Sequence, residues 1–378
     1  MTKIAQIPAR ESLHIEFKQE QVSSKDLADE IVAFSNGEGG EIWLGVDDQG
    51  KLTGISRNYE EDIMNICRTA VIPPVQPIYE EISLIDDTKK CAKITINKGT
   101  DRPYYTSKNR YYIRVGTTKR VASREELMRL FQASGLFHYD LVELQQGKLS
   151  YLNLSEIADY FERYKISFLE ESEEERIRLI QASDFIGKNE KPTVGGLLVF
   201  GITPEKLLPQ SGISLAVFDG NEINEKLNDK KEFFGSLPHQ IDNALSAIEA
   251  NIKTPSTIQG AKRLNEAKYP PKVFRELLVN ACVHRNYSLI GSRIRIFLFQ
   301  DRIEFTSPGR LPNTVSIEKL RVGTSFSRNP MLVRLMENLG YMDKLGRGLP
   351  MVCQEAKKMG KQIRFIDEGE EFKVVLEW

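Results

Sequence analysis

The stretch Ala33-Phe34-Ser35-Asn36-Gly37-Glu38-Gly39-Gly40-Glu41-Ile42-Trp43-Leu44-Gly45-Val46-Asp47-Asp48 decides the fold of the N-terminal part of the chain. Up to Phe34 the apolar residues recur at helical spacing, and from residue 41 they alternate with other residues. The first pattern predicts a helix that Ser24 caps and that ends at Asn36-Gly37. The second pattern predicts a strand over residues 41–46. Because glycine permits positive φ angles, we interpret residues 36–40 as a tight turn of the scaffold.

Further elements follow this helix and strand. Apolar alternation predicts strands over residues 78–85, 91–97 and 110–115. Ser123-Arg124-Glu125-Glu126 has the pattern of a capping box and predicts the start of another helix. We therefore expect a mixed domain over residues 1–130.

The rest of the chain also mixes helical and strand-like patterns. Residues 131–262 are expected to form a central α/β lobe, with helices near 155–164 and 172–182 and apolar strands over 196–200 and 213–218. Pro270-Pro271 marks the start of a helix and of a third domain over residues 263–378. The fold class that these patterns predict is α+β, in several mixed α/β domains.

Composition narrows the class of protein. The 378 residues include 52 Lys and Arg, 53 Asp and Glu, and 40% hydrophobic residues, which is typical of a globular protein. Since no apolar run reaches the roughly 18 residues of a membrane-spanning helix, we expect no membrane partner. The first residues lack a secretory signal pattern, and we expect a cytoplasmic protein. The four cysteines are far apart, which argues against a zinc site or a disulfide framework.

Basic residues are concentrated between residues 102 and 124, where no Asp or Glu occurs. Four tyrosines, at positions 104, 105, 111 and 112, are interleaved with them. Cations neutralise phosphates and tyrosine rings stack on unpaired bases, so the segment is a candidate nucleic-acid contact. A solvated β-hairpin explains the composition equally well. The candidate binding residues are Arg102, Lys108, Arg110, Tyr112, Arg114, Lys119 and Arg120.

Acidic residues near the N-terminus suggest a second kind of site. Glu11 and Glu16 precede Lys18, and Asp48 follows the strand expected over residues 41–46. Three converging carboxylates repel one another unless a cation lies among them, and oxygen ligands favour Mg²⁺ or Mn²⁺. A metal there, with Lys18 as a donor to the phosphate, would suit phosphodiester hydrolysis. Alternatively, the glutamates are surface acids and Lys18 is their ion-pair partner.

Three ordered blocks resemble the AlbA-like domain of Schlafen proteins. They are Glu11 to Lys18, Ala33 to Gly50, and Tyr111-Tyr112-Ile113-Arg114-Val115-Gly116. The resemblance implies a nucleic-acid-binding domain. In some animal members the domain is a metal-dependent endoribonuclease that acts on tRNA and rRNA through two glutamates and an aspartate. These match Glu11, Glu16 and Asp48, with Asp47 as the alternative to Asp48. Many bacterial relatives are described as transcriptional regulators.

The C-terminal third shows a separate resemblance. Glu276, Asn280 and His284 recur at four-residue steps on the helix that begins at Pro270-Pro271, and Gly346-Arg347-Gly348 forms a glycine-rich turn. These blocks, with the turn at Gly309, resemble a divergent GHKL-type ATP-binding domain. The resemblance implies that Glu276 orients water, Asn280 binds Mg²⁺ and the glycines approach the phosphates of ATP. Ser307-Pro308-Gly309-Arg310 replaces the usual aspartate-glycine box. A polar helix face with a satisfied histidine is the alternative.

The sequence thus predicts a nucleic-acid-binding Schlafen-like protein that cleaves tRNA or other structured RNA with Mg²⁺ or Mn²⁺ held by Glu11, Glu16 and Asp48. The alternative is a DNA-binding transcriptional regulator whose C-terminal domain senses a nucleotide or dimerises. A third hypothesis gives ATPase activity to the C-terminal domain. Small nucleic-acid-binding modules often associate symmetrically, so a homo-oligomer is also expected.

Overall fold

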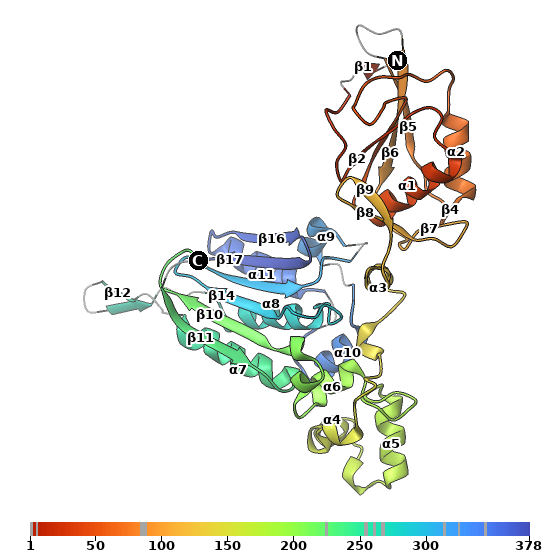
Figure 1. Ribbon diagram of the computed structural model, residues 1–378. Coiled ribbons are helices and arrows are strands. Elements are labelled where there is room, and N and C mark those ends of the chain that lie inside the picture. Colours follow the sequence, from red (N-terminus) through yellow and green to blue (C-terminus); the bar gives the residue numbers. More distant parts are fainter. Residues whose placement is uncertain are drawn as a thin grey trace. The chain divides into compact units, whose positions relative to one another are not determined.

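The computed structural model describes residues 3–4, 7–83, 89–223, 226–252, 256–259, 262–265, 269–312, 315–323, 326–343 and 346–378. The chain divides into two compact units, Met1–Phe137 and His138–Trp378, which we call the N-terminal and C-terminal units (Figure 1). The fold is mixed α+β with several sheets, as the sequence predicts. In the described ranges, no helix has both the length and the apolar character that crossing a membrane requires.

A five-stranded sheet in the order β1-β5-β6-β3-β2 forms the centre of the N-terminal unit. Its strands are β1 (Lys3–Ile4), β2 (Ile15–Lys18), β3 (Gly39–Leu44), β5 (Ile78–Ser83) and β6 (Lys90–Asn97). Strand β3 pairs parallel with β2 and antiparallel with β6. The strand expected over 41–46 begins two residues earlier. Of the strand expected over 78–85, residues 84 and 85 lie outside the described residues.

Two helices, α1 (Ser24–Asn36) and α2 (Glu60–Thr69), supply apolar side chains to a core shared with β3 and β6. Helix α1 ends where the sequence predicts, but its cap is Ser23, whose Oγ accepts from the backbone N–H of Asp26 at 3.1 Å. The turn that follows needs glycine, since Gly39 has φ +81° and a Cβ there would lie 2.6 Å from the carbonyl oxygen of Ile96. A smaller apolar cluster around Phe17 and Trp43 lines the other face of the sheet.

The remaining elements of this unit carry the basic segment. They are β4 (Val71–Ile72), β7 (Tyr105–Thr106), β8 (Tyr112–Val115), β9 (Thr118–Val121) and α3 (Arg124–Ala133). Strands β8 and β9 form an antiparallel hairpin, and β8 lies against α1. The capping box predicted at Ser123 and Glu126 is confirmed.

The C-terminal unit has a six-stranded sheet in the order β11-β10-β14-β15-β17-β16. Its strands are β10 (Ile213–Phe218), β11 (Leu227–Phe233), β14 (Ile294–Leu298), β15 (Arg302–Pro308), β16 (Ile363–Glu368) and β17 (Glu371–Glu377). Strand β10 pairs parallel with β14, so a segment expected to belong to a separate central lobe continues the C-terminal sheet. The division into domains 131–262 and 263–378 therefore differs from the observed unit. A two-stranded hairpin joins β12 (Ser256–Gln259) and β13 (Lys262–Asn265).

Helices complete this unit. They are α4 (Leu154–Glu162), α5 (Glu173–Ala182), α6 (Val194–Phe200), α7 (Leu237–Asn251), α8 (Pro271–Val283), α9 (Ile317–Val322), α10 (Pro330–Asn338) and α11 (Gly348–Lys358). Short 3₁₀ turns are η1 (Tyr139–Leu141), η2 (Leu149–Tyr151), η3 (Phe168–Glu170), η4 (Pro204–Lys206) and η5 (Pro209–Ser211). Helix α7 contacts β10, and α8 contacts both α7 and β15.

The strand predicted over residues 196–200 is wrong, because these residues lie in helix α6. All seven residues of α6 are buried, so a continuous apolar run carries no alternation that could separate helix from strand. Tight packing explains its glycines, since a Cβ on Gly196 would lie 2.1 Å from the carbonyl oxygen of Phe185.

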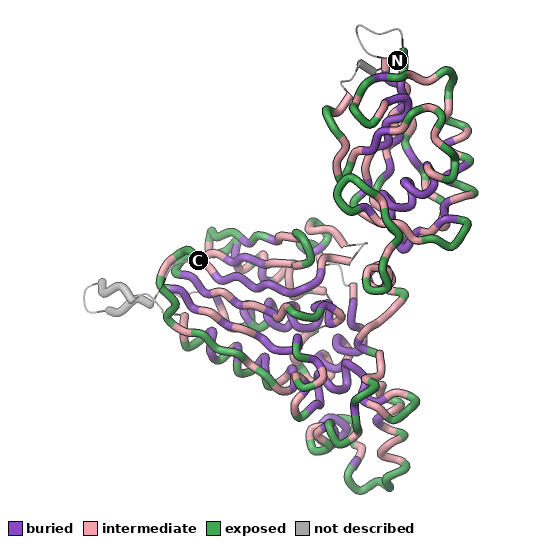
Figure 2. Tube along the Cα trace, viewed as in Figure 1, coloured by how far each residue is buried: buried purple, intermediate pink, exposed green. Residues whose placement is uncertain are grey.

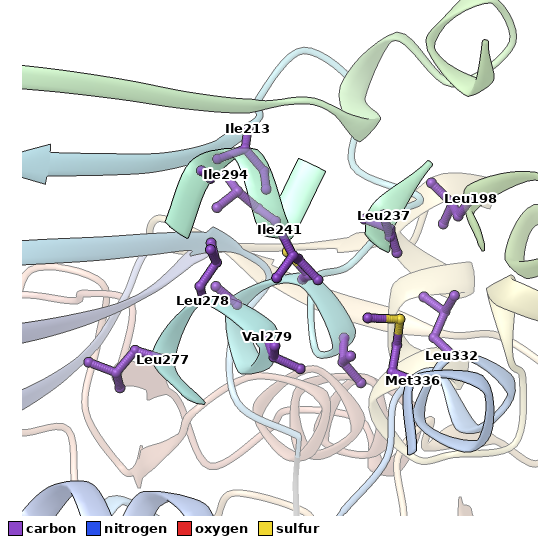
Figure 3. Packing of buried hydrophobic residues seen from close by; sticks show 14 of the residues in the cluster. Leu198, Ile213, Leu237, Ile241, Leu277, Leu278, Val279, Ile294, Leu332 and Met336 are labelled. Carbon is purple, nitrogen blue, oxygen red and sulfur yellow. The ribbon is translucent and has the colours of Figure 1, made fainter. Parts of the chain in front are cut away.

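One large apolar core holds the C-terminal unit together, and buried segments run through the sheet and its helices (Figure 2). Figure 3 shows Ile213 and Ile294, from the neighbouring strands β10 and β14, near Ile241 of α7 and Leu278 of α8. Leu332 and Met336 of α10 lie close to Leu198 of α6 and Leu237 of α7 in the same view. Elements from residues 152–376 thus share a single core.

Asp140 in η1 caps a helix that lies far from it in sequence. Its Oδ2 accepts from the backbone N–H groups of Met331 at 2.8 Å and Leu332 at 3.2 Å, at the start of α10. The residue has no exposed surface, and burial raises the pKa of Asp140 to about 6, although the two backbone donors act in the opposite direction. A buried acid therefore fixes the start of α10.

This cap predicts a pH dependence of stability. The pKa of Asp140 in the folded protein lies above its ordinary value of 3.8, so the folded state binds the proton more tightly than the unfolded state. Compared with Asp140→Asn, the wild-type free energy of unfolding should increase as the pH falls from about 7 to about 4, by at most about 3 kcal/mol. Urea unfolding of both proteins across this range measures the difference. A difference that shrinks or stays constant toward low pH contradicts the prediction.

Candidate functional site

Six charged residues of the N-terminal unit form a cluster between β2, α1 and the β8–β9 hairpin. We call it the ion cluster. Its acids are Glu16 on β2 and Asp26 and Glu30 on α1, and its bases are Lys18 on β2, Arg114 on β8 and Lys119 on β9. In strand β2, Glu16 and Lys18 lie on one face and Phe17 on the other, where Phe17 is completely buried.

Arg114 is the central cation of the ion cluster. Its Nη1 donates to Glu16 Oε2 at 2.6 Å and to Glu30 Oε2 at 3.0 Å, and its Nη2 donates to the carbonyl oxygen of Ser12 at 2.8 Å. Lys18 pairs with Glu16 and lies 3.5 Å from Glu30 Oε1. Removing one partner of such a buried group typically costs about 3–5 kcal/mol, because the opposite charge stays buried without compensation.

Lys119 closes the other side of the cluster, with Nζ at 2.6 Å from Asp26 Oδ1 and 2.7 Å from Glu30 Oε1. Burial opposes the charged form of Lys119, but its bonds to Asp26 and Glu30 outweigh burial and raise the pKa of Lys119. The pKa of Lys18 is also raised, since Glu16 and Glu30 outweigh the burial of its ammonium group. Burial raises the pKa of Glu30. Three acids and three bases therefore balance one another inside the fold.

The three carboxylates predicted to hold a metal do not converge. Both oxygens of Glu16 are bonded to Lys18 and Arg114, and Glu11 Oε1 accepts from the backbone N–H of Phe17 at 3.0 Å. Asp48 lies exposed in the turn after β3, and its alternative, Asp47, accepts from the backbone of that turn. Across the described ranges, no three His, Cys, Asp or Glu side chains are grouped so that they could hold an ion. The arrangement does not fit a shared Mg²⁺ or Mn²⁺, because the cluster already supplies its own cations.

Several predicted nucleic-acid contacts are also internal. Arg114 and Lys119 belong to the ion cluster, and Arg102 is buried, with Nη1 donating to the carbonyl oxygen of Asn36 at 3.1 Å at the end of α1. The carbonyl oxygen of Tyr112 accepts from Asn36 Nδ2 at 2.9 Å. These four residues hold β7, β8 and β9 against α1. Asp26 and Glu30 were missed from the sequence, although their four-residue spacing on one helix was visible.

Lys108 and Arg110 remain at the surface. Both are exposed on the loop between β7 and β8, and neither forms an ion pair with any residue that the structure describes. Tyr105 and Tyr111 flank this loop, with ring centroids 5.2 Å apart, and both rings are half-buried. We call Tyr105, Lys108, Arg110 and Tyr111 the loop surface. Arg120 is exposed but pairs with Glu126 at 2.5 Å.

A cavity of about 120 Å³ in the C-terminal unit brings together all five residues expected to contact a nucleotide. They are Glu276 and Asn280 on α8, Gly309 after β15, Gly346 before α11 and Gly348 at its first position. These residues come from three segments of the chain, and the first and last of them, Glu276 and Gly348, are 72 positions apart. The cavity has an apolar lining for most of its surface, with charged groups at a few places.

Glu276 faces the glycine turn of this cavity. Its Oε1 accepts from Asn280 Nδ2 at 2.6 Å, and a Cβ on Gly348 would lie 1.6 Å from that same oxygen. Burial raises the pKa of Glu276, with Asn280 acting in the opposite direction. Gly348 is therefore required because the Glu276 carboxylate lies directly against its Cα.

Histidine and arginine line another part of the cavity. His284 is half-buried at the cavity wall, and desolvation together with Arg328 lowers its pKa to about 4, so the ring is neutral at pH 7. Arg328 Nη1 donates to the carbonyl oxygen of His284 at 3.0 Å, and its Nη2 donates to the carbonyl oxygen of Arg310. Arg328 belongs to a family-like stretch, Arg321 to Pro330, but the sequence did not place it among the residues expected to contact a nucleotide. Ser307, which stands where the family has aspartate, is buried and donates to the carbonyl oxygen of Ala281 at 2.8 Å.

Comparisons with known proteins agree with the two resemblances. Residues 11–123 match the family model described as “Schlafen, AlbA_2”. Residues 291–376 match HATPase_c_4, described as “Putative ATP-dependent DNA helicase recG C-terminal”. The second match includes Gly309, Gly346 and Gly348, whereas Glu276 and Asn280 lie before it. The search of curated proteins yields no match.

Two solved structures are similar to this chain. The DIP2311 protein from Corynebacterium diphtheriae has 18% sequence identity and a TM-score of 0.48, over 97% of this chain and 64% of that protein. The chain thus spans less than two thirds of that protein's length. The N-terminal domain of a RecG-related protein from Nitrosomonas europaea has 22% identity and a TM-score of 0.23, over 26% of this chain and 72% of that domain. The two family models, Schlafen AlbA_2 at residues 11–123 and HATPase_c_4 at residues 291–376, match the pair of domain types that the sequence predicts.

Proposed function

We propose that the protein binds nucleic acid through the loop surface of its N-terminal unit. The observation that supports this proposal is the pair of exposed cations, Lys108 and Arg110, beside the half-buried rings of Tyr105 and Tyr111. A cation that has no carboxylate partner can neutralise a phosphate and release its counterion. Arg114 and Lys119 cannot do so without breaking the ion cluster.

The finer form of the proposal is recognition of RNA, with tRNA or another structured RNA favoured. Aromatic rings at the loop surface suit unpaired bases, and such bases occur in the loops of structured RNA. A transcriptional regulator that binds duplex DNA is the alternative, because phosphate contacts by Lys108 and Arg110 are independent of sequence and sugar. One assay that compares tRNA, single-stranded RNA and duplex DNA separates the two.

Loss of the two loop cations should weaken binding. The double variant Lys108→Ala, Arg110→Ala removes two phosphate contacts, so we expect affinity for tRNA to fall about tenfold or more near 0.1 M salt. The slope of log K against log salt concentration should decrease by about 1.4–1.8. Fluorescence anisotropy over a salt series measures both quantities.

The matched control is Lys357→Ala, Lys361→Ala in the C-terminal unit. It removes the same charge from exposed positions that form no ion pair in the described ranges. Its affinity and salt slope should equal those of the wild type. Equal weakening in both double variants would mean that net charge, and not the loop surface, controls binding.

Metal-dependent cleavage of the bound RNA is the most specific form of the proposal. What supports it is the order and spacing of Glu11, Glu16 and the aspartates at 47 and 48. The described carboxylates do not fit a shared ion, because Glu16 is bonded to Arg114 and Lys18. We therefore derive no cleavage step from this arrangement, and an assay has to decide.

Glu16 is the residue to test for cleavage. Incubation of the full chain with tRNA and Mn²⁺ or Mg²⁺ should yield fragments that Glu16→Gln abolishes, if the acid serves the reaction. Because Glu16 lies away from the loop cations in the hydrogen-bond network, tRNA affinity should change less than threefold, or about 0.7 kcal/mol. Denaturing gels and anisotropy measure these two quantities. Fragments of equal yield from Glu16→Gln, or no fragments from the wild type, would leave nucleic-acid binding without this chemistry.

Nucleotide sensing by the C-terminal unit is a second candidate function. The convergence of Glu276, Asn280, Gly309, Gly346 and Gly348 on one cavity favours it. Asn280 and Glu276 lie on adjacent turns of α8, which places an amide and a carboxylate together at the cavity wall. ATP with Mg²⁺ is the ligand that the family resemblance implies.

Calorimetric titration with ATP and Mg²⁺ tests this candidate. We expect saturable heat from the wild type at submillimolar to millimolar nucleotide, and at least about tenfold weaker binding by Asn280→Ala, which loses one polar contact to the site. Asn251→Ala on α7, outside the cavity lining, is the matched control. Absence of heat at millimolar ATP rules out nucleotide sensing by this cavity.

A further inference from the structure

The charges around the C-terminal cavity indicate which kind of ligand it holds. We infer that the cavity binds a small aromatic anion, whose carboxylate or phosphate lies against Arg328 and whose flat body fills the apolar part. This inference rests on the proposal that the cavity is a ligand site. It goes further by naming the ligand class and its orientation, in which the anionic group lies at Arg328 and not at the glycine turn.

Arg328 is a buried cation on the cavity wall. Only 6% of its surface is exposed, and it forms no ion pair with any residue in the described ranges. Its two contacts are the carbonyl oxygens of His284 and Arg310, and its Nε has no partner. Burying a cation is costly unless an anion or enough hydrogen-bond acceptors compensate it, and Arg328 has no carboxylate within ion-pair distance in the described ranges.

Two acids lie near enough to influence Arg328 without pairing with it. Burial lowers the pKa of Arg328 to about 10, while Asp367 and Glu370 act in the opposite direction. The guanidinium therefore stays charged at neutral pH. His284 beside it is neutral at that pH and adds no competing charge.

Arg285 shows how this fold completes a buried arginine without an acid. It has no exposed surface, but it donates to three carbonyl oxygens, those of Asn286, Leu289 and Ser292, and its Cζ lies 4.9 Å from the centroid of the Tyr287 ring. Arg285 does not line the cavity. Arg328 donates to only two carbonyl oxygens and lines the cavity. A ligand can therefore reach Arg328, whereas it cannot reach Arg285.

The opposite part of the cavity is acidic. Glu276 lies against Gly348, and Asp343, whose Oδ2 accepts from Arg347 Nη2 at 2.6 Å, also lines the cavity near the start of α11. Like charges disfavour an anionic group at the glycine turn, because the Glu276 carboxylate already lies against it. The same arrangement favours an anionic group at the Arg328 side. The charges of the cavity are thus unevenly distributed, with the Arg328 cation on one side and the Glu276 carboxylate on the other.

The body of the ligand is inferred from the lining and the volume. Between the charged ends the wall consists mainly of apolar side chains, including Leu311, Val315, Leu320, Phe326, Met342 and Phe372. Benzene binds in a dry cavity of roughly 150 Å³, and this cavity, at about 120 Å³ and open to solvent on one side, is of similar size. One aromatic ring therefore fits, with a single anionic substituent directed to Arg328.

Matched probe pairs test the charge requirement on the unmodified full chain. Benzoate is compared with benzamide, and phenyl phosphate with phenol, by calorimetry without added metal. We expect one anion of the two pairs to bind roughly tenfold to hundredfold tighter than its neutral counterpart, as a hydrogen bond to a charged group implies. The pair that responds tells carboxylate from phosphate ligands. Equal binding within both pairs, or no binding by any probe at 5 millimolar, that is on the order of the weakest specific affinities, overturns the inference.

Variants test the role of Arg328 itself. Arg328→Met should reduce binding of the responding anion to the level of its neutral counterpart, and Arg328→Lys should restore part of the affinity. Arg334→Met on α10, which pairs with Asp184 outside the cavity, is the matched control and should bind as the wild type does. If Arg328→Met fails to fold, the probe pairs decide alone. Binding of ATP with Mg²⁺ that requires Asn280 but is unchanged in Arg328→Met would overturn this inference and leave nucleotide sensing standing.

Discussion

The N-terminal unit depends on one buried guanidinium. Arg114 joins a strand, a helix and a hairpin, because its two terminal nitrogens reach Glu16, Glu30 and the carbonyl oxygen of Ser12. The fork geometry of arginine makes this possible, whereas a lysine ammonium could not present donors in several fixed directions. In the described ranges the β8–β9 hairpin pairs with no strand of the central sheet, so its contacts with α1 hold it in place. Arg114 therefore both helps to position the hairpin and neutralises the buried carboxylates of Glu16 and Glu30.

This interaction also decides which basic residues can meet a polyanion. The cations of the ion cluster are paired with its acids, so their charge is neutralised inside the fold. Cations on the loop between β7 and β8 have no such balance in the described ranges, and their charge is available to solvent. The segment from 102 to 124 thus contains both buried and exposed cations, which its composition does not separate. Arginine, lysine and tyrosine are equally suited to an internal network and to a phosphate contact, and only burial distinguishes the two uses.

Much of the fold could be predicted from local patterns, because caps, glycine turns and amphipathic helices are local in sequence. The capping box at Ser123 and the end of α1 at Asn36 are examples. Helix α6 could not be predicted, since a fully buried segment loses the periodicity that identifies a helix. The residues of the candidate sites also fall into those that local patterns could predict and those that they could not. Family-like spacing located the residues around the C-terminal cavity, but the partners of Glu16 lie up to 98 positions away and no local pattern reveals them.

The parallel pairing of β10 with β14 has a consequence for how this protein can be divided. A fragment that begins at residue 291, where the HATPase_c_4 match starts, would leave β14 as a bare edge, with backbone donors and acceptors open to other chains. It would also lack α8, so the apolar surface that α8 covers would be exposed to solvent. Such a fragment should associate with itself rather than behave as an isolated module. Strands β10 and β11 and helix α8 therefore belong to the same folding unit as residues 291–376.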